Sequence, residues 1–145
     1  MTLDNLIGKG LLHEPTSATE IRRFLAKIAI KLNDARSEQI SLDTRFDIAY
    51  EALLQIGLTA LRVNGLRPDS RGGHHLLALQ TLNKSIGYPQ DGLRLLDEFR
   101  RQRAAGLYDG SFDPSDAEVQ AILETVTDLK RHLEGWLRVR HPELL

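Results

Sequence analysis

The sequence predicts an all-α protein, specifically an antiparallel up-and-down bundle of four to five helices. Apolar residues recur at spacings of three and four along successive segments, which is the pattern of helices with one buried face. Residues that cap or break helices separate these segments. No segment shows the sustained alternation of a half-buried strand, and β-branched residues are sparse. A bundle whose helices bury their apolar faces against one another is the class that fits.

The chain divides into a lead segment, residues 1–16, and a helical-bundle domain, residues 17–141. A short helix is expected in the lead segment, ending before Pro15. Ser17 should cap the first main helix, with Glu20 completing a capping box, and this helix should end near Arg36. Its apolar stripe consists of Ile21, Phe24, Leu25, Ile28 and Leu32.

The second main helix should start at the N-cap Ser41 and close at Asn64-Gly65, since Pro68 prevents an immediate restart. Its apolar face is wide, which predicts a central position in the bundle. A part of that face left exposed would instead indicate a homodimer.

A third helix is expected from about residue 74 to 86, where Gly87 and Pro89 stop it. Its inward residues are Leu76, Leu79, Leu82 and Ile86. A fourth is expected from about residue 90 to 107. Its stripe consists of Leu93, Leu96, Phe99 and Leu107.

The fifth helix should begin with Asp113 as its cap and Pro114 in its first position, where a missing N–H costs nothing. Its last turn carries Arg138, Arg140 and His141. Cations at that end complement the helix dipole, and they could alternatively form a binding patch.

Composition narrows the class of protein further. A chain of 145 residues suits one domain, and its net charge of −1 confines any nucleic-acid contact to a local patch. There is no cysteine, so disulfides and thiolate chemistry are excluded and a cytoplasmic location is expected. No signal peptide and no apolar run of about 20 residues is evident, so we expect no membrane association.

The most informative polar cluster lies near the end of the fourth helix, with Arg100, Arg101, Arg103 and Tyr108. Arg103 follows Leu96 by seven residues and therefore falls on the apolar stripe of its own helix. A guanidinium there needs a partner. That partner could be an internal carboxylate, water reached by the end of the side chain, or a bound phosphate, which the planar guanidinium suits.

A second basic cluster, Arg67, Arg71 and His74, surrounds Gly72-Gly73 before a helix start. Such a loop can bind an anion, and it can equally be an ordinary solvated connection. The adjacent His74 and His75 point about 100° apart on a helix and do not readily chelate one metal together. We expect neither a metal nor a cofactor.

Residues 46–133 resemble the HEPN family of small bacterial helical domains. The resemblance rests on 46–52 leading to 61–68, on Gly73-His74-His75-Leu76-Leu77, and on 100–103 continuing to Tyr108-Asp109. It implies an antiparallel bundle, commonly a dimer. Many members are metal-independent ribonucleases of toxin–antitoxin or defence systems, and others are inactive partners of nucleotidyltransferases.

The family's ribonuclease motif has an arginine, a polar residue, a short spacer and a histidine. Here these positions correspond to Arg103, Ala104 and Tyr108, so the polar residue and the histidine are both absent. A tyrosine ordinarily has a pKa of about 10 and is a poor general base near neutral pH.

Three functions follow as expectations. The first is a regulatory HEPN-like module that binds a nucleotide, RNA or a partner protein such as a nucleotidyltransferase or antitoxin near Arg103 and Tyr108. The second is a metal-independent ribonuclease, with Arg103 and Tyr108 as its catalytic candidates. The third is a homodimeric interaction protein without a ligand.

Overall fold

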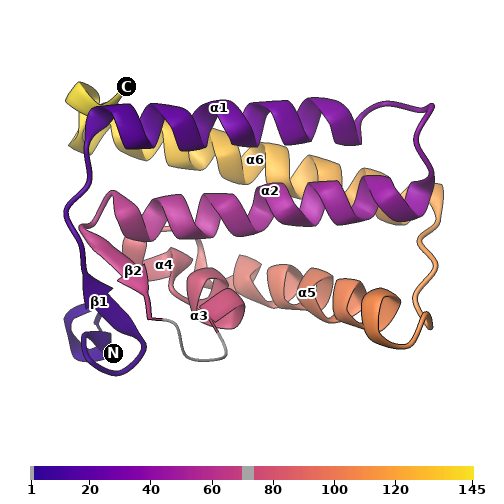
Figure 1. Ribbon diagram of the computed structural model, residues 1–145, viewed down its shortest axis with the longest axis horizontal. Coiled ribbons are helices and arrows are strands. Elements are labelled where there is room, and N and C mark those ends of the chain that lie inside the picture. Colours follow the sequence, from indigo (N-terminus) through magenta and orange to yellow (C-terminus); the bar gives the residue numbers. More distant parts are fainter. Residues whose placement is uncertain (1, 70–73) are drawn as a thin grey trace.

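Four long helices lie side by side in this computed structural model, which describes residues 2–69 and 74–145 (Figure 1). They are α1 (Ala18–Ala35), α2 (Leu42–Arg62), α5 (Leu93–Tyr108) and α6 (Asp116–Arg140). Successive long helices run in opposite directions along the chain. The predicted all-α bundle is confirmed. No helix in the described ranges has the length and apolar character needed to cross a membrane.

The starts of α1 and α2 follow the predicted caps. The hydroxyl of Ser17 accepts a hydrogen bond from the Glu20 backbone N–H at 3.2 Å, and Ser41 does the same for Thr44. The predicted capping box at Ser17 is only half formed, because the Glu20 carboxylate accepts from the Thr16 hydroxyl and from Arg62 instead.

Helix α2 is the centre of the bundle. It contacts α1, α6, α5 and α3 (His74–Gln80), and both Tyr50 and Phe46 are almost fully buried. Gly57 lets α3 approach closely, because a Cβ there would lie 3.1 Å from the Ala78 carbonyl oxygen. The wide apolar face of α2 is thus covered by the chain's own helices, and it no longer supplies a reason to expect a homodimer.

The predicted third helix is divided into α3 (His74–Gln80) and α4 (Leu82–Ser85) at Thr81. The Thr81 hydroxyl donates to the Leu77 carbonyl at 2.8 Å, a bond that competes with regular helix geometry. A 3-10 helix, Gln90–Gly92, precedes α5. Leu107, predicted to face inward, is 57% exposed, and the buried core residues of α5 end at Phe99.

Helix α6 begins two residues later than the sequence predicted. Its N-cap is Ser115, not Asp113, and Ser115 forms a complete capping box with Glu118. The helix ends near His141 and is followed by a 3-10 helix, Pro142–Leu144. The hydroxyl of Ser115 satisfies a free N–H that Asp113, placed further out, does not reach.

The lead segment is not the short α-helix that we expected. It forms a 3-10 helix, Asp4–Leu6, and a strand β1 (Leu11–His13), which pairs antiparallel with β2 (Leu66–Pro68). A small apolar cluster holds this ribbon to the end of α2 and to α3. It comprises Leu11, Leu61, Leu66 and Ala78.

Candidate functional site

Arg103 lies on the inward side of α5 and rests on α2. Leu96 and Phe99 on the same side of α5 are buried, as predicted. The Cζ atom of Arg103 lies 5.6 Å from the centre of the Tyr50 ring, a cation–π geometry. The Nε atom of Arg103 is buried and has no hydrogen-bond partner. Within residues 2–69 and 74–145, no carboxylate forms an ion pair with this guanidinium.

Tyr50 supplies a second unused polar group at the same place. Its side chain is 2% exposed, and its hydroxyl oxygen has no partner among the described residues. Burial raises the pKa of Tyr50, while the positive charges of Arg100 and Arg103 act in the opposite direction. The hydroxyl therefore stays protonated at neutral pH and can donate a hydrogen bond. The His75 ring of α3 lies 6.3 Å from the Tyr50 ring.

Asp47 lies one turn before Tyr50 on α2 and provides the nearby negative charge. Burial raises the pKa of Asp47, and repulsion from Asp43 raises it further, whereas Arg103 lowers it. The carboxylate makes no ion pair with Arg103, so it offsets only part of the guanidinium charge. We call Arg103, Tyr50 and Asp47 the Arg103 cluster. It combines a guanidinium whose Nε atom has no hydrogen-bond partner with a hydroxyl that has none either.

The other arginines of the predicted cluster are already paired. The Nε atoms of Arg100 and Arg101 lie 2.8 Å and 2.9 Å from the two carboxylate oxygens of Asp97. Arg101 is 69% exposed, so its ion pair contributes little to stability. The charge of Arg100 acts on Tyr50, whereas Arg101 lies two residues before Arg103 and is turned about 160° away from it around the helix axis.

Tyr108 does not join the Arg103 cluster. It is 82% exposed at the last residue of α5. Tyr108 follows Arg103 by five positions, which turns the two side chains about 140° apart around the helix axis. The sequence predicted Arg103 and Tyr108 as one site, and in this fold they occupy different faces of α5.

The second basic cluster also lies elsewhere. Arg67, on β2, is 3.4 Å from a carboxylate oxygen of Glu14. Glu14 also contacts Arg62, the last residue of α2. Arg62 follows Tyr50 by twelve residues, so Arg67 and Glu14 lie at a part of α2 that is about 18 Å along the helix axis from Tyr50. Arg71 and the side chain of His74 lie outside the described residues.

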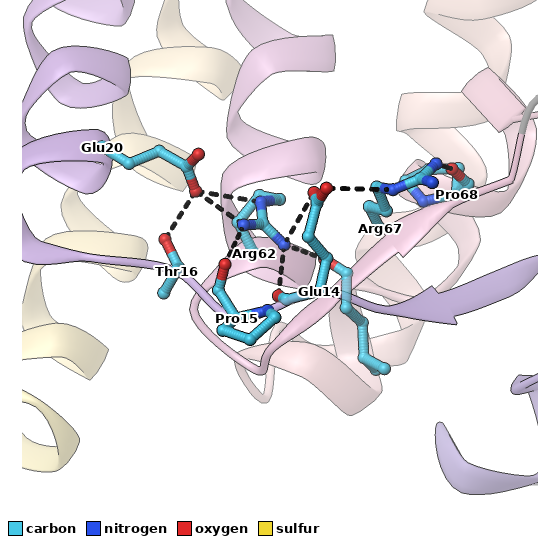
Figure 2. A network of polar contacts seen from close by, with 8 residues as sticks. Glu14, Pro15, Thr16, Glu20, Arg62, Arg67 and Pro68 are labelled. Carbon is cyan, nitrogen blue, oxygen red and sulfur yellow. Dashed lines mark hydrogen bonds and ion pairs between the residues drawn. The ribbon is translucent and has the colours of Figure 1, made fainter.

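The most completely satisfied polar network surrounds Arg62, whose side chain is 7% exposed (Figure 2). It donates to Glu20 at 2.7 Å, to the Glu14 carbonyl at 2.6 Å and to the Pro15 carbonyl at 2.8 Å. The hydrogen bond from Thr16 and the charge of Arg62 hold the pKa of Glu20 below its usual range. Every donor group of Arg62 is hydrogen-bonded within the protein. Arg62 therefore stabilises the contact of α2 with residues 14–20 and is not a binding site.

Sequence reasoning missed the α2 half of the Arg103 cluster. The available signal was Tyr50, a hydroxyl-bearing residue on an otherwise apolar stripe, with Asp47 three residues earlier on the same side. It also missed Arg62, which follows Leu58 by four residues and so lies on the apolar stripe of α2.

No group of three or more acidic or histidine side chains suited to a metal is found in the described parts of the chain. Comparison of the sequence and fold with protein-family models, with curated proteins and with solved structures finds no match.

Proposed function

We propose that this protein is a HEPN-like binding module in which Arg103 and Tyr50 hold a phosphate group of a nucleotide or RNA without cleaving it. The observation that carries the proposal is the pairing of a half-buried guanidinium that lacks an ion-pair partner with a buried hydroxyl that lacks an acceptor. The resemblance of residues 100–109 to the family's arginine-centred motif supports the same location.

A phosphate group matches the donors of the Arg103 cluster. A guanidinium and a phenol both donate hydrogen bonds, and phosphate oxygens accept them. In a site that is partly shielded from water, such a charge-assisted bond is stronger than on an open surface. The carboxylate of Asp47 opposes an anion, and its raised pKa reflects how poorly the surroundings stabilise its charge.

Binding is favoured over cleavage because the histidine of the family's ribonuclease motif is absent at its position after Arg103. The ribonucleases of the family would use a histidine at position 108, and here the exposed Tyr108 points to another face of α5. A nucleotidyltransferase or antitoxin as protein partner, and a homodimer, are further proposals that rest on the family resemblance alone.

The proposal is tested by calorimetric titration of the protein with ATP and with a short single-stranded RNA. Arg103→Ala should weaken binding by about tenfold or more, the cost of one charge-assisted contact. Tyr50→Phe should weaken binding severalfold without loss of stability, since the hydroxyl makes no bond in the free protein. Asp47→Asn should strengthen it.

The matched control is Arg131→Ala, because Arg131 is an exposed arginine of α6 paired with Asp128. The Arg131→Ala variant should bind ATP and the RNA with the same affinity as the wild type. Absence of binding by the wild type, or equal binding by Arg103→Ala, contradicts the proposal. RNA cleavage in the presence of a chelator, lost in Arg103→Ala, would support the ribonuclease instead.

A further inference from the structure

The C-terminal part of α6 carries a groove that the Arg103 cluster does not use. It has a volume of about 350 Å³ and is lined by Ile86, His132, Gly135, Trp136, Val139 and Arg140. The residues at 132, 136 and 139 recur at four and three, so they form one stripe along the helix. The α6 residues that line the groove therefore lie along one face of the helix.

The floor of this α6 groove is apolar. Val139 is 78% exposed, the most exposed of the described large aliphatic side chains. Trp136 is half-buried, with its ring 5.5 Å from that of His141. Gly135 leaves the helix surface open between them, because a Cβ there would meet nothing nearer than Arg138 Nη2 at 4.0 Å. The backbone of another helix could approach at this point.

The edges of the groove are positively charged. Arg140 lines the groove on one side, and on the Gly135 side the Nη2 atom of Arg138 lies 4.0 Å from where a Cβ on Gly135 would be. Neither has an ion-pair partner in the described residues. The nearby carboxylates are already occupied, since Glu134 lies 3.3 Å from Lys130 and Glu143 lies 3.1 Å from His141.

His132 closes one end of the groove in a defined orientation. Its Nε2 atom lies 2.7 Å from the carbonyl oxygen of Ile86. A carbonyl only accepts, so Nε2 carries the proton and Nδ1 remains as the other ring nitrogen. The Tyr88 ring meets the His132 ring edge-on at 5.6 Å and fixes it further.

We propose that the α6 groove docks an acidic amphipathic helix of a partner protein. The apolar face of that helix would lie on Trp136 and Val139, and carboxylates on its two flanks would pair with Arg138 and Arg140. Charge complementarity favours this occupant over a second copy of the chain. In a twofold-symmetric dimer through this face, Arg138 and Arg140 of one copy would lie close to the same arginines of the other copy, and their positive charges would repel one another.

Trp136 is the only tryptophan of the chain, so its fluorescence reports on the groove directly. The probe is a synthetic amphipathic helix of about 16 residues with leucines on one face and glutamates on both flanks. The control peptide has the same sequence with lysines in place of the glutamates. We expect a saturable change of Trp136 emission with the glutamate peptide, and binding at least about tenfold weaker with the lysine peptide.

The double variant Arg138→Glu, Arg140→Glu should reverse this preference, and Val139→Glu should weaken binding of the glutamate peptide. The control is Ile30→Glu, which adds the same charge at a position of α1 that is 59% exposed, and it should bind like the wild type. The proposal is overturned if neither peptide binds, if both bind equally, or if charge reversal has no effect. Tighter binding to phosphatidylserine vesicles, or a dimer in sedimentation that Val139→Glu dissociates, would also overturn it.

Discussion

Two arginines on the apolar sides of their helices have opposite surroundings in this protein. Arg62 finds a carboxylate and three backbone carbonyls, so each part of its guanidinium is satisfied. Among the described residues, Arg103 contacts the face of the Tyr50 ring and forms no ion pair with a carboxylate. Burying a charge is costly unless it is paired and hydrogen-bonded. The first residue therefore stabilises the fold, and the second is the one to which we assign the proposed phosphate ligand.

Replacing Arg62 should be among the most destabilising single changes in the chain. Arg62→Ala leaves the carbonyls of Glu14 and Pro15 without their Arg62 donor, and leaves the Glu20 carboxylate with the Thr16 hydroxyl but without its cation. We expect a loss of about 3 kcal/mol in the free energy of unfolding, measured by urea denaturation. The control Arg131→Ala breaks an ion pair whose side chains are 70% exposed, and it should change stability by less than about 0.5 kcal/mol. A similar loss of unfolding free energy in both variants would show that the hydrogen bonds of Arg62 do not stabilise the fold as we infer.

The elements of the bundle are defined by short polar signals at their ends. Ser17, Ser41 and Ser115 each accept a hydrogen bond from a backbone N–H of the first turn. Two of these caps were predicted from the sequence. The third was assigned to Asp113, because an aspartate followed by a proline is itself a common helix start. A serine–glutamate pair two residues later competed with it, and the capping box forms there.

This assignment predicts different effects for two neighbouring substitutions. Ser115→Ala removes the capping oxygen of α6 and should lower stability by about 1 kcal/mol in thermal or urea unfolding. Asp113→Ala should change it by less than about 0.5 kcal/mol, because that carboxylate caps nothing in this structure. A larger loss of stability in Asp113→Ala than in Ser115→Ala would instead indicate that Asp113 is the N-cap of α6.

At the scale of the whole molecule, α2 links two apolar clusters. The main cluster lies among α1, α2, α5 and α6, and the smaller cluster lies under the β1–β2 ribbon. Leu61 belongs to the smaller cluster, while Ala60 on the same helix belongs to the main one. Because one rigid helix carries both, we expect the ribbon and the bundle to unfold together.

Leu11→Ala tests this coupling, since Leu11 is fully buried in the ribbon cluster. Removing its side chain should cost about 2 to 4 kcal/mol. The unfolding midpoints measured by circular dichroism and by Trp136 fluorescence should fall together, although Trp136 packs against the main cluster and not against the ribbon cluster. A fluorescence midpoint that stays at the wild-type value would show that the ribbon melts separately. The exposed Ile30→Ala serves as the control and should shift neither midpoint appreciably.

The sequence by itself determined the helical class, the long helices and most of the core, because helical periodicity and capping are local properties. Ser17 and Ser41 were readable as caps, and Leu96 and Phe99 as buried residues, from spacing alone. The extended form of residues 11–13 could not be predicted from spacing, because a three-residue strand exists only through its partner at 66–68.

The tertiary structure likewise decided the surroundings of each arginine. Spacing showed that Arg103 lies on an apolar stripe, but only the packing of α5 on α2 gives it Tyr50 in place of a carboxylate and separates it from Tyr108, because those contacts join residues far apart in the chain.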